Sequence, residues 1–153
     1  MTVLTDSKVS TITRVRPRSI NIIAILMSLT IIRGFMVTML PSLEMFGGVN
    51  PDAWLAPWVS DTILGILVPF MVYLLLSKRG ILIWGILLTY NAIGAFDYLH
   101  GLSTQWTDPL IPDGIMGTPG MTFGSIGFSL LLQLTAIYLL LQKDVVSYLT
   151  RTR

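Results

Sequence analysis

Three charged residues, Arg33, Asp61 and Asp97, stand inside long apolar stretches of this sequence. If the stretches cross a membrane, a charge within them is costly, and such residues usually face the interior of a helix bundle and pair with one another. One arginine and two aspartates leave one spare negative charge when both carboxyls are ionised. The trio therefore indicates either a structural ion pair or a site for a proton or a small ligand, and both interpretations stay open.

The stretch that contains Asp97 carries further polar residues. Tyr90 and Asn91 lie about two helical turns before Asp97, and His100 lies one turn after it. A histidine beside an aspartate can relay protons near neutral pH, although an interfacial histidine without such a role is the more common case. We include all four residues in a predicted polar cluster with Arg33 and Asp61.

The last apolar stretch carries a polar stripe. Ser125, Ser129 and Gln133 recur at intervals of four residues, which places them along one side of a helix. Such side chains either bond across a close helix contact or line a polar cavity. We expect this stripe to face the Arg33, Asp61 and Asp97 trio. A set of small residues lies largely on another face: Gly120, Gly124 and Gly127.

A second stripe runs through Asp61, Gly65 and Pro69, again at intervals of four. Proline removes a backbone hydrogen bond and clashes with the carbonyl four residues earlier, so a kink is expected and the Gly65 carbonyl needs a new partner. An adjustable helix beside Asp61 favours this aspartate over Asp97 as the working carboxyl.

The composition excludes several classes of protein. Of 153 residues, 53% are hydrophobic and 12% are charged, whereas a soluble domain has about 25% charged residues. A soluble globule of this composition would expose too much apolar surface. With no cysteine and one histidine, disulfides, thiol chemistry and a multi-histidine metal site are excluded. No phosphate loop, dinucleotide motif or nucleophile signature is present, so we expect no catalytic residue, metal or cofactor.

The apolar stretches predict four membrane spans, because a spanning helix needs about 20 mostly apolar residues. The spans are expected at residues 19–40, 57–76, 81–100 and 118–142, with Pro41 closing the first and Gly101 stopping the third. The fold class is therefore an all-α integral membrane protein, a four-transmembrane-helix antiparallel bundle. It forms one domain over 19–142, preceded by a basic arm (1–18) and followed by a short tail (143–153).

Basic residues define the orientation, because cytoplasmic segments are rich in Lys and Arg. Nine of the ten basic residues lie before the first span, in the tight second connection or after the fourth span: Lys8, Arg14, Arg16, Arg18, Lys78, Arg79, Lys143, Arg151 and Arg153. The two longer connections hold four acidic residues and no basic one: Glu44, Asp52, Asp108 and Asp113. We expect both termini to be cytoplasmic. This asymmetry also explains the net charge of +2 without a nucleic-acid partner.

These features leave three classes of function. The first is a non-enzymatic accessory or assembly component of a membrane complex, which the small size favours. The second is an outward-facing binding protein or proton-linked transporter for a small polar solute, and the third is an integral membrane enzyme. We expect a multi-pass protein of the plasma (inner) membrane, surrounded by lipid and joined to copies of itself or to other subunits, with a possible small polar ligand from the outer side.

The orientation is testable because the chain contains no cysteine. In intact cells, a membrane-impermeant thiol reagent should label Asp52→Cys and should leave Lys78→Cys unlabelled until the membrane is opened. Labelling of position 78 from outside, with position 52 protected, would reverse the predicted orientation.

Overall fold

A computed structural model of the chain describes residues 16–110 and 119–151, and all of its regular structure in these two ranges is helical. Four helical segments are long and apolar enough to cross a membrane: Arg18–Phe46, Asp52–Ser77, Ile81–Thr107 and Gly120–Leu140. The predicted all-helical chain with four possible membrane spans is thus confirmed. Parts of the predicted arm, outer loop and tail (1–15, 111–118 and 152–153) lie outside the described residues, among them Lys8, Arg14, Asp113 and Arg153.

The first span is not one uniform α-helix. It consists of α1 (Arg18–Leu29), the 3-10 segment η1 (Thr30–Phe35), α2 (Met36–Met39), the 3-10 turn η2 (Leu40–Ser42) and α3 (Leu43–Phe46). A 3-10 stretch inside a longer helix is tighter and often marks a strained or functional segment. Arg33 lies within η1. The expectation that Pro41 ends this helix is wrong, because Pro41 occupies the first turn of η2, where a missing N–H is tolerated.

The other helices are α4 (Asp52–Ser77), α5 (Ile81–Thr107), α6 (Pro119–Leu140) and the short α7 (Lys143–Thr150). The expectation that Gly101 stops the third span is wrong, because α5 continues to Thr107. Gly101 is buried, and a side chain added there would contact Ile126 of α6 at 3.8 Å. α6 therefore packs on α5 at this point, beyond the predicted end of the span.

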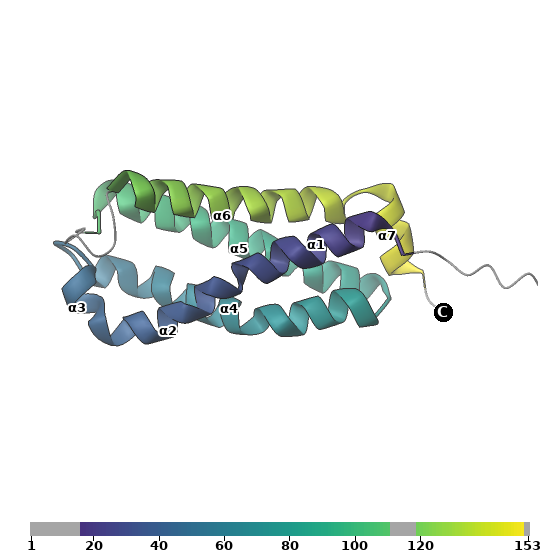
Figure 1. The fold of residues 1–153 in the computed structure, drawn as a ribbon, viewed down its shortest axis with the longest axis horizontal. Helices are drawn as coiled ribbons and strands as arrows, with labels where there is room; N and C mark the ends of the chain where they lie inside the picture. The colour runs from purple at the N-terminus through teal and green to yellow at the C-terminus, as the bar shows by residue number, and fades with distance from the viewer. Residues whose placement is uncertain (1–15, 111–118, 152–153) are drawn as a thin grey trace, which may run out of the picture.

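The long helices lie side by side along the long axis of the molecule (Figure 1). α5 packs against α4 and α6, while α1 packs against α4 and α6, and η1 and α2 pack on α4. A single apolar core fills the part of the bundle nearer α7. Its fully buried members are Ile20, Ile23, Met27, Leu75, Leu87, Leu140, Val145 and Leu149.

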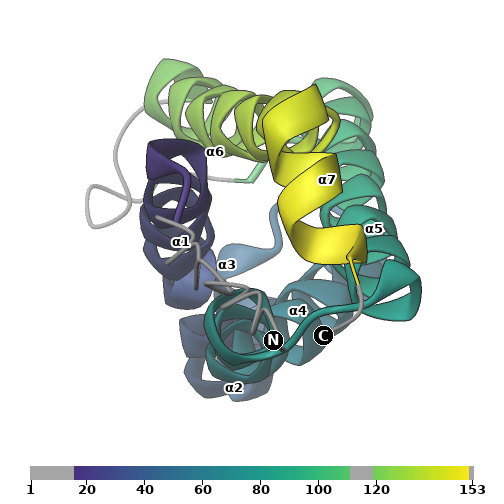
Figure 2. The ribbon, with the colours of Figure 1, turned by 90° about the vertical axis from the view of Figure 1, so that its right-hand side faces the viewer.

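One end of the bundle is covered by α7, which crosses it beside α5 and α6 (Figure 2). The amide N of Gly80, in the turn between α4 and α5, donates a hydrogen bond to the carbonyl of Leu149 at 2.6 Å. Arg16, before α1, donates to the carbonyl of Leu76 at 3.2 Å. Both described chain ends and the α4–α5 turn therefore lie at this end, which we call the α7 end.

A close backbone contact joins the first span to α4. A Cβ atom built on Gly65 would overlap the backbone of Gly34 and would lie 2.7 Å from the carbonyl carbon of Arg33. Only a residue without a side chain lets η1 approach α4 this closely. The sequence predicted a role for the Gly65 carbonyl, which needs a new hydrogen-bond partner because Pro69 follows four residues later. In the structure, the absence of its side chain brings Arg33 onto α4.

This contact predicts that Gly65→Ala destabilises the protein, because the new methyl group pushes η1 away from α4. Gly85→Ala is the matched control, since a Cβ at Gly85 meets no atom within 4 Å. Alanine is preferred to glycine in a helix interior by about 1 kcal/mol. When thermal unfolding is measured in the same detergent, Gly65→Ala should lower the midpoint temperature of unfolding. Gly85→Ala should leave that temperature unchanged or raise it. Equal effects of the two substitutions would contradict the close contact.

Candidate functional site

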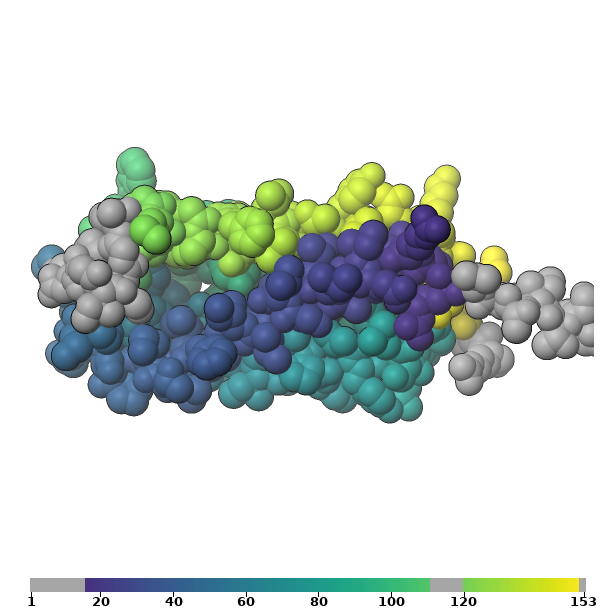
Figure 3. All heavy atoms as spheres, in the orientation of Figure 1, coloured from purple at the N-terminus to yellow at the C-terminus, as the bar shows by residue number. Residues whose placement is uncertain are grey.

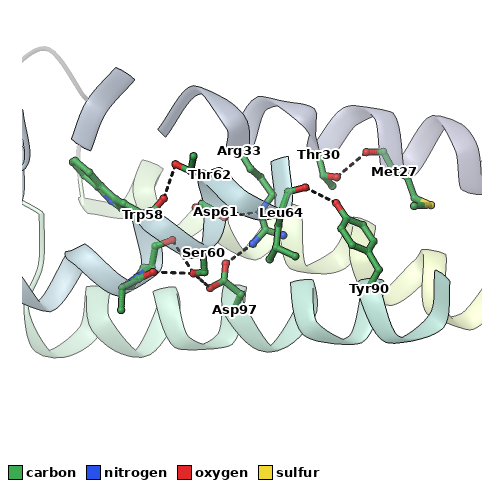
Figure 4. Close-up of polar contacts among 12 residues, drawn as sticks. Met27, Thr30, Arg33, Trp58, Ser60, Asp61, Thr62, Leu64, Tyr90 and Asp97 are labelled. Carbon is green, nitrogen blue, oxygen red and sulfur yellow. Dashed lines mark hydrogen bonds and ion pairs between the residues drawn. The ribbon is translucent and has the colours of Figure 1, made fainter. Parts of the chain in front are cut away.

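Arg33 is the centre of a buried ion-pair cluster. Its side chain is 2% exposed, and its Nε donates a hydrogen bond to Asp61 Oδ1 of α4 at 2.5 Å. Its Nη2 donates to Asp97 Oδ2 of α5. Figure 4 shows the guanidinium between the two aspartates. Three residues from three different spans are thus brought together, and we call them the Arg33 cluster.

The two carboxyls of the cluster have different surroundings. Asp97 is 9% exposed and accepts hydrogen bonds at both oxygens, from Arg33 at Oδ2 and from the Ser60 hydroxyl at Oδ1. Asp61 is 23% exposed and accepts one hydrogen bond in the described part of the chain, from Arg33 at Oδ1. The carboxyls are close enough to interact directly. Asp97 is therefore the more enclosed of the two, and Asp61 is the more accessible.

An aromatic ring completes the surroundings of the guanidinium. Arg33 Cζ lies 4.1 Å from the centroid of the Tyr98 ring, which is the geometry of a cation–π interaction. Ser129 of α6 lies beside the Tyr98 side chain. Tyr98 thus connects the Arg33 cluster to the polar stripe predicted on α6.

Gln133 of α6 approaches the same arginine across Gly94 of α5. Its amide occupies the space that a side chain at Gly94 would fill, and Arg33 Nη1 lies 3.1 Å from that Cβ position. Neither Arg33 Nη1 nor Gln133 Nε2 has a hydrogen-bond partner among residues 16–110 and 119–151, although both atoms are buried. A buried donor without a partner is costly. The two donors therefore favour a water molecule or another acceptor between α5 and α6.

Tyr90 and Asn91 lie nearer the α7 end than Asp97. The Tyr90 hydroxyl donates to the carbonyl of Leu64 at 2.8 Å, which joins α5 to α4. Asn91 is completely buried and donates to the carbonyl of Leu87 at 2.7 Å, while its Oδ1 has no partner in the described chain. Tyr90 belongs to the apolar core, and Asn91 lies against its members Met27 and Leu87.

His100 and Ser125 lie apart from the cluster. Both are exposed, and the Ser125 hydroxyl donates to the carbonyl of Thr122 in its own helix at 2.9 Å. In the described structure, neither side chain has a hydrogen bond or ion pair with Arg33, Asp61 or Asp97. The role of His100 as a proton relay stays a prediction.

Two neighbours of the trio were not predicted as site residues: Ser60 and Tyr98. Each stands next to a cluster aspartate in the sequence, and this adjacency is the signal that could have found them. Helical spacing assigns neighbouring residues to different sides of a helix, about 100° apart. Ser60 nevertheless reaches across from α4 to Asp97 of α5, because the two helices pack closely at this level.

Comparison of the chain with protein-family models, with curated proteins and with solved structures gave no match. In the described residues, no group of three or more His, Cys, Asp or Glu side chains could hold a metal ion. The chemistry of the site must therefore be inferred from the Arg33 cluster and the polar side chains around it.

The cluster predicts a characteristic pattern in a mutant cycle. Arg33→Leu should be strongly destabilising because it leaves two carboxyls without their cation, a loss of about 3–5 kcal/mol for a buried pair in soluble proteins and less where a carboxyl takes up a proton. Replacing Arg33, Asp61 and Asp97 together with Leu, Asn and Asn should cost less than Arg33→Leu alone. Unfolding free energies in mixed micelles would measure this, and purely additive losses would show that the residues do not interact.

Proposed function

We propose that this chain is a non-enzymatic component of a larger membrane assembly and that α6 contacts its partner. The partner is expected to be a transmembrane helix, from a second copy of the chain or from another subunit. Two properties of α6 support the proposal: the fourth span is the least buried of the four candidate spans, and glycines lie on its exposed side.

The glycines of α6 are the observation that carries the proposal. Gly120, Gly124 and Gly127 lie along one side of the helix, and a Cβ at Gly124 or Gly127 would meet no atom within 4 Å. Each glycine inside a helix costs about 1 kcal/mol relative to alanine. Here no contact within the described chain offsets that cost. Small residues are enriched where membrane helices approach each other closely, so a partner helix at this glycine face would supply the missing contact.

The space-filling view agrees with this proposal. Between the part of α6 farther from the α7 end and the first span, the surface is hollowed, so that deeper atoms of the bundle are visible (Figure 3). α6 packs on α1 and α5, whereas η1 and α2 pack on α4. In this part of the molecule α6 therefore packs against α5, while the first span lies on α4. This arrangement leaves the glycine face of α6 accessible to a partner.

We infer the orientation of the assembly from charge. The α7 end carries the described basic residues Arg16, Arg18, Lys78, Arg79, Lys143 and Arg151. Since cytoplasmic segments are rich in Lys and Arg, we propose that the α7 end is cytoplasmic and that the protein lies in the plasma (inner) membrane as an antiparallel bundle. The glycine face and the Arg33 cluster would then be nearer the outer side.

A second candidate function is supported by the unpartnered donors Arg33 Nη1 and Gln133 Nε2. Together with the partly exposed Asp61, they would suit an outward-facing binding protein or proton-linked transporter for a small polar solute. Flux measurements on the purified chain in vesicles separate this candidate from an assembly role.

The assembly role predicts a crosslink at the glycine face. A photo-crosslinker attached to Gly124→Cys in native membranes should capture a second copy or another subunit. Leu99→Cys is the matched control, because Leu99 is exposed on α5 at a similar depth, as the contact of Gly101 with Ile126 indicates. The mass of the product distinguishes the two kinds of partner. Equal capture at both positions, or capture at neither, would refute the proposal.

A further inference from the structure

The Arg33 cluster contains more acidic than basic groups. The charged and titratable groups around Asp61 are Arg33 from η1 and Asp97 and Tyr98 from α5, while Ser129 and Gln133 of α6 lie beside Tyr98 and Arg33. Arg33 is the single cation among them. With both carboxyls ionised, the cluster would hold one excess negative charge away from water.

Two neighbouring carboxylates that share a poorly solvated site repel each other, and binding one proton removes the repulsion. The proton need not reside equally on both groups. Its position depends on which carboxyl has the stronger hydrogen-bond donors and which has an oxygen free to carry it. The structure distinguishes the two carboxyls in both respects.

Both oxygens of Asp97 already accept hydrogen bonds. Its Oδ2 accepts from the Arg33 guanidinium, and its Oδ1 accepts from the Ser60 hydroxyl. Hydrogen bonds donated to both oxygens of a carboxyl favour its ionised form. A proton placed on Asp97 would have to displace one of these donors.

Asp61 has an oxygen that can carry the proton. Its Oδ1 accepts from Arg33 Nε, whereas its Oδ2 has no donor among the described residues. With 23% of its side chain exposed, compared with 9% for Asp97, Asp61 is the more accessible of the two carboxyls.

We propose that Asp61 is a proton-binding site that takes up one exchangeable proton, while Asp97 stays paired with Arg33. In the protonated state Asp61 is a neutral acid, and the single charge of Arg33 balances that of Asp97. On release, the O–H bond of Asp61 breaks, the proton passes to water, and the cluster gains one negative charge. Arg33, held in the 3-10 segment η1, then binds two anionic partners instead of one.

Infrared spectroscopy of the purified full-length chain in lipid nanodiscs tests this site. As the pH is lowered from neutral, the wild type should gain the C=O stretch of a protonated carboxylic acid, and the band should shift on exchange into deuterated water. Raising the pH should remove the band reversibly. Asp52→Asn is the matched control, because Asp52 is exposed at the first turn of α4, and it should leave the band unchanged.

Conservative exchanges locate the proton. Asp61→Glu should shift the frequency of the band, because the protonated side chain itself has changed, whereas Asp97→Glu should leave the frequency in place. Asp61→Asn should abolish the band. Absence of the band in the wild type, or a frequency that follows Asp97→Glu instead, would overturn the proposal.

A second measurement covers the case in which an exchanged protein does not fold. Carbon-13 NMR of labelled aspartate in the wild-type chain should place the Asp61 carboxyl at the shift of an acid and the Asp97 carboxyl at that of a carboxylate. The reverse assignment, or two carboxylates, would refute the site. These readouts involve no partner helix, so they are independent of the proposed assembly through α6.

Discussion

A guanidinium that is 2% exposed inside an apolar bundle must be neutralised by nearby carboxyls. Arg33 meets this requirement through Asp61 and Asp97, and much of the arrangement around it serves that contact. Gly34 and Gly65 let η1 lie directly on α4, and Gly94 leaves space beside the guanidinium. A larger side chain at Gly65 would separate the charges, so the ion pairs constrain the helix distances as much as the helices position the charges.

The bundle divides into two parts with different physical properties. Near α7, fully buried apolar side chains fill the space between the helices, and α7 closes the end with Val145 and Leu149. Farther from α7, the interior holds the Arg33 cluster, and α6 has an exposed glycine face. Apolar packing gives the first part its stability. The second part contains the groups that we propose bind a proton and a partner, and η1 connects the two parts.

Much of the fold could be predicted from local sequence because membrane spans depend on long apolar runs. The ends of the spans were less predictable. Pro41 and Gly101 are typical of helix ends, yet helical structure continues past both. The Trp54 indole donates to the carbonyl of Asp108 at 2.7 Å, so contacts between α4 and the end of α5 hold residues that local preference would leave in a loop.

The sequence by itself determined that Arg33, Asp61 and Asp97 lie at similar depth, because the fixed rise of a helix converts residue number into depth. Only the tertiary structure decided which atoms meet: Ser60 binds Asp97, Tyr98 lies under the guanidinium, and Asp61 Oδ2 has no donor among the residues that the structure describes. These contacts depend on the rotation of each helix about its axis and on the distance between helices. Both are determined by packing among residues far apart in the chain, which the local pattern of hydrophobic residues does not record.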